Sequence, residues 1–167
     1  MNSKTYILLY NDGSIGFMTV YEQTRVTHTE DGDMVEYYMP VPADELKKWP
    51  EAARSTVKSY REIDPALIPT DRTFRDAWRD GGNTKVKIDM KRARDVWREK
   101  MRKVRKPLLE ALDVEYQRAD ERDDTNAKTA IAQRKERLRD VTDHPDIADA
   151  RTPDELKEVW PEELTNE

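Results

Sequence analysis

Residues 89–122 read DMKRARDVWREKMRKVRKPLLEALDVEYQRADER, and the rest of the chain is organised around this segment. Its apolar residues follow one another in steps of three or four, which is the spacing of one face of an α-helix. Met90, Met101 and Leu112 lie eleven residues apart, a period of about 3.67 residues per turn. We therefore expect a long, nearly straight helix laid across other elements. Its buried stripe should comprise Trp97, Met101, Val104, Leu108 and Leu112.

Pro107 lies inside this predicted helix. A proline in a helix interior removes one hydrogen bond and clashes with the preceding turn, at about 3 kcal/mol. We expect a kink or a break near residues 103–106. Residues 118–126 are polar apart from one alanine and predict a turn. A second amphipathic helix over residues 126–141 should then pack back antiparallel, completing a helical hairpin.

The first part of the chain, residues 4–41, predicts β structure. Residues 5–10 and 15–21 flank Asn-Asp-Gly-Ser, and residues 25–29 and 34–39 flank Glu-Asp-Gly-Asp. Asp-Gly supplies the positive φ that a tight hairpin turn needs. Two successive hairpins indicate an antiparallel meander, which should bury one face because a lone hairpin is marginally stable.

The fold class is therefore α+β: an N-terminal antiparallel β-meander, then a kinked α-helical hairpin with short flanking helices. The remaining elements are short helices, turns and strands between the two halves and after the hairpin. Residues 55–63 alternate in a way that favours a strand over a helix. We expect a β-rich domain at residues 1–63, a linker with a short helix and strand at 64–88, and a helical domain at 89–167. The short helices are predicted at residues 42–50, 73–78 and 152–160.

Composition limits the functional classes. The chain has 167 residues, of which 36% are apolar and 39% charged, and it contains no cysteine. Disulfides and thiolate zinc sites are thereby excluded. No apolar run has the length of a membrane span or resembles a signal peptide. A soluble protein made in the cytoplasm is the expectation.

Charge is unevenly distributed along the chain. Residues 1–62 carry 7 basic and 10 acidic side chains, residues 63–106 carry 14 and 7, and residues 107–167 carry 9 and 18. The basic residues of the long helix could follow a phosphate backbone. They surround its apolar stripe on both sides, however, and do not gather on one edge. We therefore expect a solvated or internally paired surface and consider nucleic-acid binding unlikely.

No catalytic or metal-binding pattern emerges. The two histidines, His28 and His144, are far apart, and residues 30–33 lack the spacing of a calcium loop. No glycine-rich phosphate loop follows a predicted strand, and no serine or threonine has a credible histidine–carboxylate set. The sequence predicts a protein that is not an enzyme and has no cofactor.

A short motif occurs twice. Residues 44–51 (DELKKWPE) resemble residues 154–162 (DELKEVWPE), so two predicted helices each stop at a Trp-Pro pair. Under the interpretation that we favour, Trp49 and Trp160 fill gaps in the core beside a helix end. Under the alternative, they are matching docking points for a partner.

Several motifs resemble phage sequences. Residues 71–78 (DRTFRDAW) and 87–94 (KIDMKRAR) are similar to a pattern in small proteins of tailed bacteriophages and prophages, often encoded near tail genes. Residues 105–113 (RKPLLEALD), followed by 137–141 (RLRDV), resemble the helical C-terminal region of phage tail-fibre assembly and tail assembly chaperone proteins. The resemblance covers roughly residues 71–163.

The resemblance implies a role in protein–protein interaction: an assembly chaperone-like protein that binds a phage tail or fibre protein in the host cytoplasm during phage assembly. Alternative functions are a structural component of the virion (tail, neck or fibre accessory) and an inhibitor of a host defence complex. A second copy of the chain, in a homo-oligomer, is the other partner considered. The hairpin at residues 89–141 is expected to contact the partner, and residues 4–41 to set orientation. The candidate interaction residues are Met90, Trp97, Leu109, Tyr116, Trp49 and Trp160.

Overall fold

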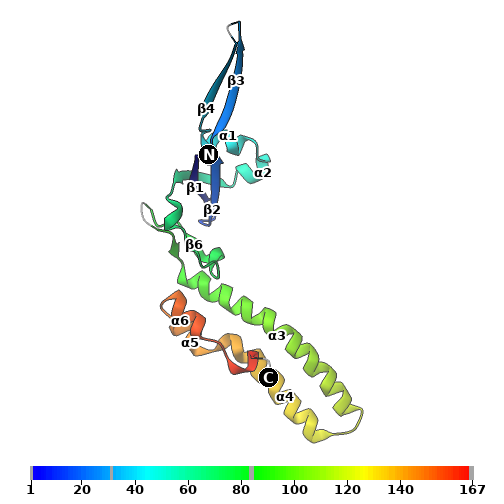
Figure 1. Cartoon of the computed structure of the whole chain (residues 1–167). Coiled ribbons are helices and arrows are strands. Elements are labelled where there is room, and N and C mark those ends of the chain that lie inside the picture. The colour runs from blue at the N-terminus through cyan, green and yellow to red at the C-terminus, as the bar shows by residue number, and fades with distance from the viewer. Residues whose placement is uncertain (1, 31, 83–84, 166–167) are drawn as a thin grey trace. The chain divides into compact units, whose positions relative to one another are not determined.

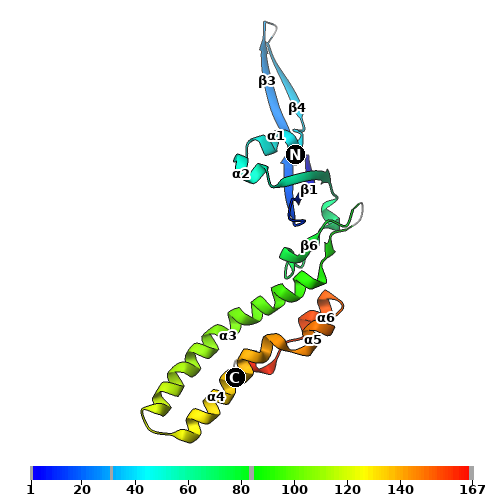
Figure 2. The same ribbon diagram turned by 180° about the vertical axis from the view of Figure 1, so that it is seen from behind.

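The computed structural model describes residues 2–30, 32–82 and 85–165 (Figures 1 and 2). Its contacts divide the chain into two compact units, Met1–Lys87 and Ile88–Glu167. Antiparallel strands occupy the first unit and helices the second, so the predicted α+β class is confirmed. The segment 64–88, expected as a linker, belongs almost entirely to the first unit.

A three-stranded antiparallel sheet forms the centre of the first unit. Its strands are β1 (Ser3–Tyr10), β2 (Ile15–Tyr21) and β5 (Val57–Glu62), in the order β2-β1-β5. The β1–β2 hairpin turns at Gly13, whose φ of 77° requires glycine, and the strand at 57–62 agrees with the alternation in the sequence. The middle of β1, Tyr6 to Leu8, is buried because this strand has a neighbour on each side.

The second predicted hairpin forms a sheet of its own. Strands β3 (Gln23–Thr29) and β4 (Gly32–Tyr38) pair only with each other among the described residues. The strands therefore do not make one continuous meander. Only one residue separates the end of β2 from the start of β3, which is too short a connection for the chain to reverse and pair β3 with β2. The expected buried face is also wrong: every described residue from 24 to 37 is exposed.

Short elements complete the first unit. Helix α1 (Pro42–Lys47) was predicted, whereas α2 (Glu51–Arg54) was not, because Pro50 begins this second helix as well as ending the first. Two 3₁₀ turns follow at Pro65–Leu67 and Arg75–Ala77, and then β6 (Trp78–Arg79) pairs with β7 (Lys87–Ile88). The other buried apolar residues of this unit are Val20, Leu46, Ile63, Phe74, Ala77, Trp78 and Val86.

Helix α3 (Met90–Asp120) organises the second unit. Its first turn is capped by Asp89, whose carboxylate accepts hydrogen bonds from the backbone N–H groups of Lys91 and Arg92. The helix continues through Pro107 as one element of 31 residues, so Pro107 does not break it. Pro107 is exposed, and the stripe on the other side of the helix is held by packing both before and after it.

Helix α4 (Thr125–Asp140) packs against α3, and the rest of the chain returns along both helices (Figure 1). This return comprises a 3₁₀ turn (Val141–Asp143), α5 (Pro145–Asp149), α6 (Pro153–Glu158) and a last 3₁₀ turn (Glu162–Leu164). Of the predicted stripe, Trp97, Met101 and Leu112 are buried, while Val104 and Leu108 are half-buried. The buried partners from the other elements are Ile131, Leu138, Val141, Ile147, Leu156 and Leu164.

Candidate functional site

The most exposed cluster of apolar side chains lies on β3 and β4. We call Val26, Met34, Val35 and Tyr37 the ribbon surface; their exposed fractions are 49%, 58%, 50% and 68%. Val26 lies opposite Val35 in the ladder, and Thr24 lies opposite Tyr37. Because cross-strand partners share a face, three of the four apolar side chains lie on one face and Met34 on the other. In Figures 1 and 2, no other described element of the first unit covers the part of this hairpin beyond α1.

Polar contacts fix the hairpin at its base and near its tip. The Tyr38 hydroxyl donates to Gln23 Oε1 at 3.0 Å, and the Gln23 amide donates to Glu45 of α1 at 3.5 Å. Near the tip, His28 Nδ1 lies 2.5 Å from an Asp33 carboxylate oxygen. An isolated two-stranded hairpin is marginally stable in water, and these contacts define its base and register while leaving its apolar side chains exposed.

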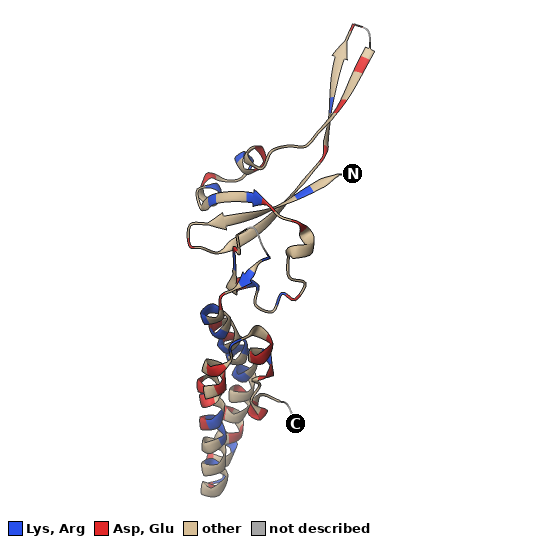
Figure 3. Ribbon diagram, turned by 90° about the vertical axis from the view of Figure 1, so that its left-hand side faces the viewer, with Lys and Arg blue, Asp and Glu red and all other residues tan. Residues whose placement is uncertain are grey.

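The hairpin is acidic. Residues 23–38 contain Arg25 as the only arginine or lysine, against the four acidic residues Glu30, Asp31, Asp33 and Glu36, which gives 1 − 4 = −3 with His28 neutral. Figure 3 shows acidic positions on this hairpin, whereas α3 carries closely mixed charges of both signs. The negative charge of the hairpin would thus favour binding of a basic partner over binding of an acidic partner.

Two of the predicted interaction residues pack together inside the second unit. Trp97 is 4% exposed, and its indole N–H donates to the Val159 carbonyl at 2.8 Å. The half-buried Trp160 ring meets Trp97 edge-to-face, with centroids 5.5 Å apart, and Lys100 Nζ lies 4.5 Å from the Trp97 centroid. Trp160 therefore fits the interpretation of a side chain that fills a core gap beside a helix end.

Of the other four predicted interaction residues, one lies in the first unit and three are spread along α3. Trp49 belongs to the first unit and is half-buried after α1. Met90 and Leu109 are half-buried on α3, and Tyr116 is 37% exposed with Lys135 Nζ 5.4 Å from its ring centroid. Sequence reasoning missed the ribbon surface because it assumed a four-stranded sheet that would bury one face.

The basic residues of α3 are partly used within the second unit. Arg94 donates to the Ala150 carbonyl at 2.8 Å, Arg98 to the Thr142 carbonyl at 3.2 Å and Arg105 to the Arg139 carbonyl at 2.6 Å. These carbonyls lie at or near the C-terminal ends of helical segments, where the backbone lacks donors and the dipole favours cations. Two of these arginines thus fasten the returning chain to α3, and Arg105 fastens α4 to it.

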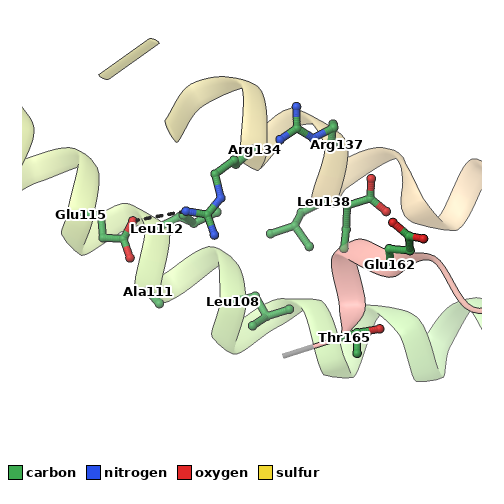
Figure 4. A pocket seen from close by; sticks show the side chains of 10 residues that line it. Leu108, Ala111, Leu112, Glu115, Arg134, Arg137, Leu138, Glu162 and Thr165 are labelled. Carbon is green, nitrogen blue, oxygen red and sulfur yellow. Dashed lines mark ion pairs between the residues drawn. The ribbon is translucent and has the colours of Figure 1, made fainter. Parts of the chain in front are cut away.

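A groove of about 590 Å³ lies between α3, α4 and the last 3₁₀ turn (Figure 4). Its lining includes the leucines Leu108, Leu112 and Leu138 together with charged side chains of both signs. Arg134 spans the two helices toward Glu115, at 3.9 Å. The lining contains two arginines and three glutamates, so it offers no strong preference for either sign of charge.

The shifted pKa values have local structural causes. The hydrogen bond from Arg61, at 2.5 Å, lowers the pKa of Asp80, and the backbone N–H of Arg151 lowers the pKa of Glu155. Glu62 raises the pKa of Lys4, and Asp120 likewise raises the pKa of Lys128. None of these groups lines the groove, and the described residues contain no cluster of three or more metal-ligating side chains.

No protein-family description, curated protein or solved structure matches this chain. Within the part of the chain that the structure describes, no helix is long and apolar enough to cross a membrane.

Proposed function

We propose that this protein acts by binding another protein, and that the ribbon surface is its contact. The observation that carries the proposal is the exposure of four apolar side chains, each about half or more accessible, on a single projecting hairpin. Exposed apolar side chains that gather in one place typically mark an interaction site. The strands also present unpaired backbone groups along their outer edges, a second feature that favours association.

The partner that we propose is a phage tail or tail-fibre protein, bound in an assembly chaperone-like role. The support for this identity is the resemblance of residues 71–78, 87–94, 105–113 and 137–141 to proteins of tailed phages. A chaperone of this kind would hold an apolar surface of the unassembled subunit and release it on assembly. This would take place in the host cytoplasm.

The ribbon surface supports the proposal better than the helical hairpin does. In the second unit, the side chains that could have formed an apolar docking stripe are largely buried against α4 and the returning chain. The large apolar side chains that remain exposed on α3 are Val114 and Tyr116, at 48% and 37%. We therefore assign the contact to β3 and β4, and assign α3 and α4 to the framework.

Co-purification from host cells that express the phage genes tests this function. The full-length tagged protein should recover an identified tail or fibre subunit, and purified virions should lack the protein. Recovery of the subunit together with presence in virions would favour a structural virion component instead. Recovery of a host defence complex and no tail or fibre subunit would contradict the proposal and support the inhibitor alternative.

A further inference from the structure

We propose that the partner is bound as an additional β-strand on the open edge of β4, and that this strand carries two basic residues separated by two apolar ones. The inference rests on the proposed function, since it specifies what the ribbon surface recognises. Binding by strand addition uses main-chain hydrogen bonds for affinity and alternate side chains for specificity. It requires an open, regular edge and a complementary arrangement of side chains.

The β3–β4 hairpin has the most regular open edges of the first unit. Its ladder runs from Gln23–Tyr38 to Thr29–Gly32 without a register shift. The edge of β5, by contrast, is interrupted where Tyr10 pairs with Val57, leaving Lys58 as an extra residue. A bulge and a lysine are devices that protect an edge against pairing. Strand β2 packs against α1, which leaves the hairpin as the favoured place for an added strand.

Within the hairpin, the side chains favour β4 over β3. Strand β4 contributes Met34, Val35 and Tyr37 to the ribbon surface, and β3 contributes only Val26. The charges differ as well, because β4 holds two acidic residues in its sequence GDMVEYY, while β3 holds Arg25. Glu36 lies opposite Arg25 in the ladder, yet among the described residues no ion pair joins Glu36 to a cation.

The order of residues on β4 fixes the order expected in the partner. Side chains directly opposite each other share a face and interact, and opposite charges there are favourable. An antiparallel strand would meet Tyr37, Glu36, Val35, Met34 and Asp33 in turn. Its sequence should therefore read apolar, basic, apolar, apolar, basic. The two basic residues would lie on opposite faces, beside Glu36 and Asp33.

A second copy of this chain is a less suitable occupant. Two hairpins of net charge −3 would repel each other, and pairing β4 with β4 would bring acidic residues together. The β5 segment Val-Lys-Ser-Tyr-Arg does carry basic residues at the required spacing. However, its lysine falls at the interruption of the ladder, and Arg61 is already bonded to Asp80 at 2.5 Å.

A synthetic peptide containing Val-Lys-Val-Ile-Arg provides the probe, and the same peptide with glutamate at both basic positions is its control. Binding to the full-length protein is measured by fluorescence anisotropy. We expect the basic peptide to bind and the acidic one to bind at least about fivefold more weakly. Glu36→Lys should abolish this preference, because each peptide would then meet one opposite and one like charge, at residue 36 and at Asp33. The matched substitution on β3, Arg25→Glu, should not weaken binding of the basic peptide. Circular dichroism verifies that both protein variants fold.

A second measurement separates strand addition from contact with a face. Methylating the peptide nitrogens that would donate to β4 should weaken binding by about fivefold for each lost hydrogen bond, while methylating the alternate nitrogens should have little effect. If methylating either set of nitrogens weakened peptide binding equally, strand addition would be overturned. Loss of binding in Arg25→Glu but not in Glu36→Lys would overturn the assignment to β4. Self-association through β4, detected by sedimentation and abolished by Val35→Lys, would make a second copy the occupant and also overturn the inference.

The two proposals can fail separately. If the wild-type protein captures a tail or fibre subunit, but Glu36→Lys captures it equally well and the basic peptide does not bind, the strand-addition inference fails and the proposed function stands. If the peptide results are as expected but no tail or fibre subunit is captured, the proposed function fails while the recognition of a basic strand stands.

Discussion

At the scale of single residues, Trp97 connects the most parts of the second unit. It is buried on α3, donates a hydrogen bond to Val159 and meets Trp160 edge-to-face. The residues after α6 are thereby tied to the long helix, although they are distant in sequence. Trp97 was a candidate for both the core and the interface, and its burial makes it a core residue.

Trp97→Ala should lower the free energy of unfolding by about 3–5 kcal/mol, because it removes a large buried side chain. Trp97→Phe should have a smaller effect, about 1–3 kcal/mol, since it keeps much of the apolar area but leaves the Val159 carbonyl without its donor. Urea unfolding followed by circular dichroism measures both. An unchanged midpoint for Trp97→Ala would contradict the packing described here.

The Arg61–Asp80 pair has a comparable role in the first unit. The Asp80 carboxylate accepts from Arg61 and from the Gly82 N–H, and both charged side chains are largely buried. The bond from Arg61 keeps the pKa of Asp80 below its ordinary value of 3.8. The pair therefore stabilises the fold at pH values where Asp80 is ionised.

Asp80→Asn should lower the free energy of unfolding by about 1–3 kcal/mol at neutral pH. Because the folded-state pKa of Asp80 is lowered, its contribution is fully present above pH 3.8 and is lost as the pH falls through the folded-state pKa. The difference between wild type and variant should thus shrink below pH 3.8. Unfolding curves at several pH values measure it, with the exposed Asp76→Asn as control. A difference independent of pH would exclude the ion pair as the cause.

At the scale of elements, α3 shows how tertiary packing overrides a local signal. Pro107 favours a kink or a break, but the apolar stripe continues across it and holds the helix as one element. Packing of an amphipathic face supplies most of the stability of a helix in a folded protein. The sequence indicated a kink or a break at Pro107, and the break is wrong. The sequence alone could not weigh the proline against packing, because it does not show which elements cover the apolar stripe.

Pro107→Ala should stabilise the second unit by about 1–3 kcal/mol, because alanine restores the missing backbone hydrogen bond and removes the steric clash. The neighbouring exposed substitution Lys106→Ala serves as control and should change stability by less than about 0.5 kcal/mol. Thermal or urea unfolding measures both variants. Destabilisation by Pro107→Ala would mean that the helix depends on a distortion at this position.

The two β-hairpins show which features of the sheets could be predicted from the sequence. Both turns were predictable because Asp-Gly provides the positive φ seen at Gly13 and Gly32. The strand order was not, because pairing β1 with β5 depends on contacts between residues about fifty positions apart along the chain. The exposure of Val35 and Tyr37 also followed only from the structure, in which a single residue separates β3 from β2 and the two strands do not pair.

At the scale of the whole molecule, we assign different roles to the two units. The second unit buries its apolar stripe and uses three arginines to fasten its own chain, whereas the first presents an acidic hairpin with exposed apolar side chains. Of the candidate interaction residues on α3, Trp97 is buried and Met90 and Leu109 are half-buried. Hydrophobic periodicity identifies residues able to be buried, and it cannot separate a core from an interface.

The most direct test of the central claim compares one substitution at two equally exposed valines. Val35 on β4 and Val114 on α3 are 50% and 48% exposed. Isothermal titration calorimetry measures the affinity of each full-length variant for the tail or fibre subunit. We expect Val35→Lys to weaken binding at least about tenfold and Val114→Lys to change it less than about twofold. Loss of binding in Val114→Lys with unchanged binding in Val35→Lys would contradict this expectation and return the contact to the helical hairpin.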